Sequence, residues 1–116
     1  MAGETILHVG YDSMLIEIRE GVLRRAGYHI LSVKGSDEAK RVSAEVEADL
    51  IIIGNGGRPD ERGEIVDWLA RKLPGIPILV MRVSNEETYP GATVEFIGNT
   101  PSQWLQTIEK TLASQG

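Results

Sequence analysis

The sequence predicts a doubly wound α/β fold, in which helices cover both faces of a parallel β-sheet. Three observations support this prediction. Strand-like and helix-like segments alternate along the chain, which is the pattern of strands joined by right-handed helical crossovers. Two of the strand-like segments are apolar at consecutive positions, as strands buried on both faces are. The length of 116 residues suits one compact domain, so we expect a single domain over residues 1–116.

The first part of the chain contains two strand-like runs with a helix between them. Residues 5–9 form a short apolar run that ends at Gly10, and residues 28–33 form a second run typical of a strand. Asp12 or Ser13 can cap the helix between them, because either side-chain oxygen accepts from free amides of the first turn. Gly27 is expected to end this helix. Its apolar residues are Leu15, Ile18, Val22, Leu23 and Ala26.

A second helix is expected to start with Ser36 as its cap, and it carries Ala39, Val42 and Val46 on one face. Residues 49–53 are the clearest strand of the chain, because consecutive apolar residues require burial on both faces. A glycine-rich loop at residues 54–59 leads into a third helix, which ends at Pro74. The apolar residues of this third helix are Ile65, Val66, Leu69 and Leu73.

Two more strands and one helix complete the predicted fold. Residues 76–81 form another doubly buried strand, and residues 93–97 form a shorter one. Thr100 followed by Pro101 is a typical helix start, and Trp104, Leu105, Ile108 and Leu112 supply that helix with a buried stripe. Both tryptophans, Trp68 and Trp104, are predicted to pack at the edge of the core.

The connection between the last two strands is unusually short. Only ten residues, 83–92, lie between Arg82 and Thr93. A crossover between parallel strands normally needs about a dozen residues or more, usually with a full helix. Pro90 and Gly91 would also end a helix early. We therefore expect a loop or a single helical turn in place of a helix.

Composition excludes several classes of function. The net charge of −5, without a cluster of Lys or Arg, argues against binding to nucleic acid. No cysteine is present, so disulfides and thiolate metal sites are excluded. The apolar runs are too short to cross a membrane and no signal-like segment is visible, so we expect a cytoplasmic protein. His8 and His29 lack the partners of a metal site and are expected to pack in the core or at its edge.

Several segments together resemble a known family. Residues 6–12 followed by a helix, and then Gly27-Tyr28-His29-Ile30, resemble the opening of bacterial response-regulator receiver domains. The strand at residues 49–53, the strand at residues 77–81 and the Thr100-Pro101 helix start extend the likeness over residues 5–112. The resemblance implies a flavodoxin-like sheet of five parallel strands in the order 2-1-3-4-5, with about four helices. The family's fourth helix would be shortened or absent here.

The resemblance also implies where the chemistry of such a domain would lie. In that family an acidic pair binds Mg²⁺, an aspartate accepts the phosphoryl group, and a Ser or Thr and a lysine complete the pocket. The cation and the ammonium are needed because the carboxylate nucleophile and the phosphoryl group are both anionic. The matching positions in this sequence are Gly10 and Tyr11 for the acidic pair, Gly54 for the aspartate, Arg82 for the Ser or Thr, and Ile97 or Gly98 for the lysine.

None of these positions carries the required group. Asp12 is the nearest remaining carboxylate, and we interpret it as a helix cap and not as a metal ligand. The degenerate phosphorylation pocket therefore consists of Gly10, Tyr11, Asp12, Gly54, Arg82 and Gly98. We expect no catalysis, no bound metal and no cofactor.

Two features of this pocket leave alternatives open. The loop Gly54, Asn55, Gly56 and Gly57 could cradle a small anion or a nucleotide phosphate with its amides. It lacks the lysine and hydroxyl of a P-loop, so we favour a tight left-handed turn. Arg82 either fills the emptied pocket, paired with Asp12 or with carbonyls of the loop, or extends to solvent.

These observations predict a receiver-like signalling domain that cannot be phosphorylated and that acts by protein–protein interaction in a two-component-type pathway. The candidate partners are a histidine kinase, an output protein or a second copy of the chain. The alternative is a module that senses a small anion or nucleotide at the glycine-rich loop. An enzyme with new chemistry is the least supported hypothesis, because no catalytic set of residues can be placed.

Overall fold

The computed structural model describes residues 3–82, 88–97 and 100–114. Its strands are β1 (Thr5–Gly10), β2 (His29–Lys34), β3 (Leu50–Ile53), β4 (Ile78–Met81) and β5 (Val94–Phe96). Its helices are α1 (Ser13–Arg25), α2 (Ser36–Ser43), α3 (Pro59–Lys72) and α4 (Pro101–Ala113). All the strand pairs are parallel, and their order is β2-β1-β3-β4-β5. The predicted fold class is confirmed.

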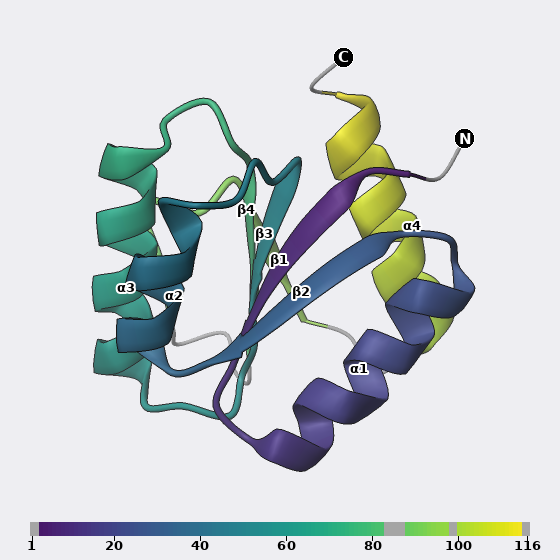
Figure 1. Ribbon diagram of the computed structural model, residues 1–116, viewed down its shortest axis with the longest axis horizontal. Coiled ribbons are helices and arrows are strands. Elements are labelled where there is room, and N and C mark those ends of the chain that lie inside the picture. The colour runs from purple at the N-terminus through teal and green to yellow at the C-terminus, as the bar shows by residue number, and fades with distance from the viewer. Residues whose placement is uncertain (1–2, 83–87, 98–99, 115–116) are drawn as a thin grey trace.

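The helices form two layers, one on each face of the sheet. Figure 1 shows α2 and α3 on one face, and α1 and α4 on the other. Each layer has its own core cluster against the sheet: Ile65 and Leu69 of α3 belong to one, and Leu23 of α1 and Ile108 of α4 belong to the other. β3 contributes to both clusters and is buried at every position, as its run of apolar residues predicts.

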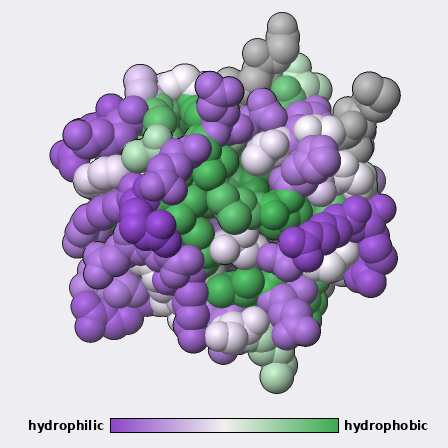
Figure 2. Space-filling view, in the orientation of Figure 1, coloured by the Kyte–Doolittle hydropathy of each residue, from purple (hydrophilic) through white to green (hydrophobic). Residues whose placement is uncertain are grey.

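The edge strands are less covered than the central ones. Along β2, buried or half-buried residues alternate with exposed ones, and Leu31 is 38% exposed. Figure 2 shows apolar surface in the middle of the face that β2 crosses, surrounded by polar residues. The central strands β1, β3 and β4 therefore contribute most of the sheet's buried residues. The predicted pocket positions lie at the edge of the sheet where these three strands end.

The helix starts follow the sequence in two cases and differ in one. The Asp12 carboxylate accepts from the amide of Leu15 at 3.0 Å, which confirms that residue as a cap. Thr100 Oγ1 accepts from the amide of Gln103 at 3.3 Å, with Pro101 in the first turn. The prediction for Ser36 was wrong: this residue is the first of α2, and the cap is the preceding glycine, with a φ of 89° and no side chain to offer.

The connection from β4 to β5 lies only partly within the described residues. Of the predicted loop at residues 83–92, residues 83–87 lie outside the described part. The remainder forms a turn in which the amide of Ala92 donates to the carbonyl of Tyr89 at 2.9 Å. Tyr89 is buried against the core cluster that α3 shares with the sheet. No residue of the described part, 88–92, is helical.

Both tryptophans pack as predicted. Trp104 is buried in the core cluster under α4, and Trp68 is partly buried against the cluster under α3. His8 is buried, as predicted, whereas the prediction for His29 was wrong, because this residue is exposed at the start of β2. Within the described ranges, no helix is long and apolar enough to cross a membrane.

Candidate functional site

The carboxyl ends of the central strands bring the predicted pocket positions together. Val9 of β1 lies opposite Ile53 of β3, which lies opposite Val80 of β4. The amide of Gly54 donates to the carbonyl of Val9 at 2.8 Å. The residues that follow the three strands therefore meet at one edge of the sheet, as ligand-binding residues of open α/β sheets do. The predicted position Gly98 lies outside the described residues.

The first part of this pocket is filled by an apolar side chain. A Cβ atom built on Gly10 would overlap the side chain of Ile16, which extends from α1. No acidic residue can therefore stand at this position unless α1 or its side chains move. Tyr11, the next residue, turns toward α2, where its hydroxyl lies 3.2 Å from that of Ser36. Burial raises the pKa of this phenol, and the hydrogen bond to Ser36 opposes the rise.

The second part of the pocket holds a guanidinium group. A Cβ atom built on Gly54 would lie 3.1 Å from Arg19 Nη1, which comes from α1. Arg19 Nη2 donates to Asn55 Oδ1 at 2.9 Å. Desolvation lowers the pKa of Arg19, and the nearby Asp12 charge opposes this effect. A fixed cation thus stands where the resemblance places a carboxylate nucleophile.

The glycine-rich loop packs closely onto the residues after β1. A Cβ atom on Gly57 would lie 2.6 Å from Cγ of Tyr11, and one on Gly56 would lie 3.4 Å from Cβ of Asp12. The prediction of a left-handed turn was wrong, because neither these glycines nor Gly54 have a positive φ. Glycine is required here by close approach and not by backbone conformation.

A second arginine holds this loop in place. Arg62 of α3 is 1% exposed; its Nε donates to the carbonyl of Gly57 at 3.2 Å and its Nη1 to the carbonyl of Met81 at 3.1 Å. Its guanidinium also lies 5.5 Å from the ring centroid of Tyr89, a cation–π distance. One side chain therefore joins the loop after β3, the end of β4 and the turn before β5.

Arg82 has a partner that neither predicted alternative includes. Its Nη1 lies 3.4 Å from Oε1 of Glu95, and its side chain is 16% exposed. Glu95 is on β5, directly opposite Val80 in the register of the two strands. The pair joins the residue after β4 to the last strand of the sheet.

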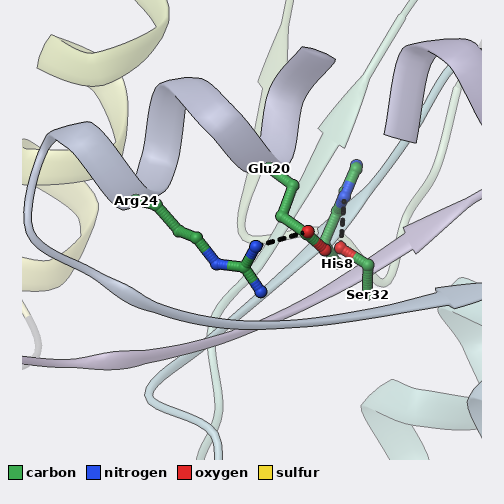
Figure 3. Close-up of polar contacts among 4 residues, drawn as sticks. All are labelled: His8, Glu20, Arg24 and Ser32. Atoms are coloured by element: carbon green, nitrogen blue, oxygen red, sulfur yellow. Dashed lines mark hydrogen bonds and ion pairs between the residues drawn. The ribbon is translucent and has the colours of Figure 1, made fainter. Parts of the chain in front are cut away.

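His8 is a buried histidine that takes no part in the pocket. Its Nδ1 lies 3.3 Å from the hydroxyl of Ser32 on the neighbouring strand, and its Nε2 has no hydrogen-bond partner among the described residues. Figure 3 shows this pair close to the ion pair of Glu20 and Arg24 on α1. Burial lowers the pKa of His8 to about 4; the Arg19 charge also lowers it, and the Glu20 charge opposes both. His8 is therefore neutral near pH 7 and serves as core packing, as predicted.

Sequence reasoning missed three residues of the site, and one signal could have found two of them. Arg19 lies four residues after Leu15 and three before Val22, so it occupies the buried stripe of its helix. Arg62 lies three residues before Ile65 and in the same way belongs to the buried stripe of α3. A charged residue inside a buried stripe needs a polar partner. Their positions in the stripes could therefore have identified both arginines as residues with buried polar contacts. Ile16 carries no such signal.

The arrangement offers positive charge and no nucleophile. The positions expected for carboxylates carry glycine or tyrosine, and the carboxylate that follows them, Asp12, caps α1. In the described part of the chain, no group of three or more His, Asp or Glu side chains could hold a metal ion.

Comparisons with known proteins agree with the architecture. No family model matches the chain. A transcriptional regulatory protein of Pseudomonas aeruginosa, GltR, is 32% identical over 88 residues, which are 73% of this chain and 36% of GltR. The chain thus spans about a third of the length of this relative. Among solved structures, a CheY-like receiver domain of Methanospirillum hungatei superposes with a TM-score of 0.86 at 18% identity, covering 97% of this chain and 95% of that one.

A second solved structure gives the same result. The response regulator TrrA of Thermotoga maritima, in a complex with Mg²⁺ and BeF, has a TM-score of 0.81 at 18% identity, covering 94% of this chain and 98% of TrrA. TrrA is also known in a complex with the histidine kinase ThkA. The chain has the fold of a response-regulator receiver domain.

Proposed function

We propose that this chain is a receiver-like domain that cannot be phosphorylated and that acts by binding a protein partner in a two-component-type pathway. One observation carries the proposal: Gly54 offers no acceptor atom, and the guanidinium of Arg19 lies beside it, 3.1 Å from the place of a Cβ. Phosphoryl transfer to a receiver needs a carboxylate nucleophile and a divalent cation that offsets its charge. The first requirement is not met at Gly54.

The metal site fails for an independent reason. Mg²⁺ is usually held by one or two carboxylates together with phosphate oxygens and water. The position of a side chain at Gly10, the last residue of β1, is covered by Ile16, and the Asp12 carboxylate accepts from the amide of Leu15. TrrA, which has the same fold, binds Mg²⁺ together with BeF. We expect this chain to bind neither.

The pocket is built for one conformation. In a phosphorylated receiver the added group shifts an equilibrium between two states, and it can do so only through its different affinity for them. Here Arg62 fixes the loop after β3 to the end of β4, and Arg19 fixes the same loop to α1. A domain held in this way presents its partner surface constantly. Regulation then depends on the abundance of this protein or on its partner. We expect this partner to be an output protein or a histidine kinase, such as the one that TrrA binds.

The alternative of a nucleotide or phosphate cradle at the glycine-rich loop is less favoured. Such a cradle needs backbone amides that face an open site. Two of the loop glycines instead face the Tyr11 ring and the Asp12 side chain at close range. No catalytic role is proposed for the domain, which we take to be residues 1–116.

Binding of beryllofluoride tests the proposal. The chain and TrrA are each titrated with Mg²⁺ and beryllofluoride, and ¹⁹F NMR reports the bound anion. We expect a bound signal for TrrA and none for this chain, together with an unchanged ¹⁵N–¹H spectrum of this chain. A stoichiometric, Mg²⁺-dependent bound signal would show that the pocket still works.

A further inference from the structure

An apolar groove lies between α1 and α4, next to the pocket. It has a volume of about 180 Å³, and its apolar walls include Ile18 and Val22 of α1, Phe96 of β5 and Trp104 of α4. An engineered apolar cavity of about 150 Å³ is large enough to bind benzene. The groove can therefore hold a benzene ring or an alkyl chain of similar size. Figure 1 shows the two helices side by side on one face of the sheet.

One charged residue is among those that line this groove. Arg19, whose guanidinium lies beside Gly54, is also one of the groove residues. Its side chain is half-buried, and its one hydrogen bond to a described side chain goes to the neutral amide of Asn55. It makes no ion pair within residues 3–82, 88–97 and 100–114. Burial desolvates this cation more than the nearby Asp12 charge compensates, and an anion in the groove would offset the remaining cost in free energy.

The chemistry of the groove selects a class of ligand. Apolar walls with a few polar groups that fix orientation are typical of small-molecule sites. A guanidinium matches a carboxylate with two parallel hydrogen bonds, and a single cation balances a single negative charge. A phosphate dianion would bring an excess of charge into this apolar site. A monocarboxylate therefore fits better than a phosphate.

We propose that the α1–α4 groove binds a small organic acid, with its aryl or alkyl body between Ile18 and Trp104 and its carboxylate on Arg19. The inference goes beyond the proposed function, because it supplies a ligand for a domain that phosphate cannot switch. Arg19 also donates to Asn55, so a bound carboxylate acts on the loop after β3. A bound ligand would thus act on the loop after β3, where the resemblance to receivers places the phosphorylated residue.

An NMR titration of the ¹⁵N-labelled chain tests the site with three probes of one shape. The probes are 3-phenylpropionate, the neutral 3-phenylpropan-1-ol and the cationic 3-phenylpropylamine. We expect saturable shifts for the acid at Ile18, at the Arg19 side chain and at Thr100, which also lines the groove. The alcohol should bind about tenfold more weakly than the acid, as the loss of one charge-assisted interaction predicts. The amine should not bind there.

Three variants distinguish the contribution of the ion pair to binding from that of the apolar walls. Arg19→Gln should weaken the acid about tenfold and leave the alcohol unchanged. Arg25→Gln removes the same charge from an exposed position of the same helix and should change neither affinity. Ile18→Ser, at a side chain that is 55% exposed, alters the wall without touching the core and should weaken acid and alcohol alike.

Several results would overturn the assignment. The acid and the alcohol could bind equally well, Arg19→Gln could behave like Arg25→Gln, or the shifts could map away from the groove or fail to saturate. A fourth arm uses the peptide N-acetyl-Phe-Glu amide: if only this peptide binds, the groove is a protein docking site and the proposal is wrong. None of these results bears on phosphorylation, which is measured separately by mass.

Discussion

The buried histidine of β1 predicts a specific loss of stability in mild acid. His8 is 0% exposed, and burial lowers its pKa from 6.5 to about 4. Because the folded-state pKa lies below the unfolded-state value, the unfolded chain binds the proton first as the pH falls. The free energy of unfolding therefore decreases between about pH 6.5 and pH 4. Each pKa unit is worth about 1.4 kcal/mol, so this one group should remove about 2 kcal/mol by pH 5 and about 3 kcal/mol by pH 4.

The chain contains its own control, because it has two histidines and only one is buried. Urea melts at pH 7, 6 and 5 give the free energy of unfolding by linear extrapolation. His8→Met should flatten the decrease between pH 7 and 5 relative to the original chain. His29→Gln, at the exposed position, should leave the decrease unchanged. If His8→Met and the original chain lose stability in parallel, the burial of a neutral imidazole is not the cause and the reasoning fails.

Two further predictions concern the packing of the glycine-rich loop, and thermal or urea melts check both. Arg62→Met should cost about 3 kcal/mol, because it removes the donor from one buried and one partly buried carbonyl. Arg58→Met, at an exposed surface pair, should cost less than about 1 kcal/mol. Equal costs would show that the hydrogen bonds of Arg62 to this loop do not stabilise the fold. Gly57→Ala should cost about 1–3 kcal/mol, because its Cβ would overlap the Tyr11 ring. Gly63→Ala, with open space at that position of α3, should instead stabilise the chain by about 0.5–1 kcal/mol. A Gly57→Ala variant with an unchanged free energy of unfolding would contradict the close packing.

Local patterns predicted most of the fold correctly. Consecutive apolar residues identified β3 and β4 as buried strands, and the caps at Asp12 and Thr100 followed from side-chain chemistry at helix starts. The strand order is not encoded in any local pattern, and the resemblance to receivers supplied it. The error at Ser36 arose because the preceding glycine, with its positive φ, takes the cap position.

The site was harder to predict, because its contents depend on contacts between distant residues. Glycines in a loop usually indicate a special backbone conformation, yet Gly57 is needed because Tyr11, 46 positions earlier, lies against it. The sequence showed that the carboxylates are missing, but not that Ile16 and Arg19 occupy their places. Which side chain fills an emptied pocket is decided by how α1 packs on the sheet, and no spacing along the chain states this.

A variant that restores the acceptor distinguishes two reasons for inactivity. Gly54→Asp supplies a carboxylate, but its Cβ would lie 3.1 Å from Arg19 Nη1. An ion pair there would keep the carboxylate engaged, and the metal position would still be covered by Ile16. We therefore expect this variant to remain unmodified when it is incubated with acetyl phosphate and Mg²⁺ and its intact mass is recorded. A gain of one phosphoryl group would mean that the missing aspartate was the only barrier.

The same measurement on the unaltered chain tests the central claim most directly. The protein is incubated with acetyl phosphate and Mg²⁺ beside TrrA as a positive control, and the intact mass of each is recorded before and after hydroxylamine. We expect the mass of this chain not to change, because Gly54 offers no acceptor and Arg19 occupies the space beside it. A stoichiometric gain of one phosphoryl group that hydroxylamine removes would contradict it.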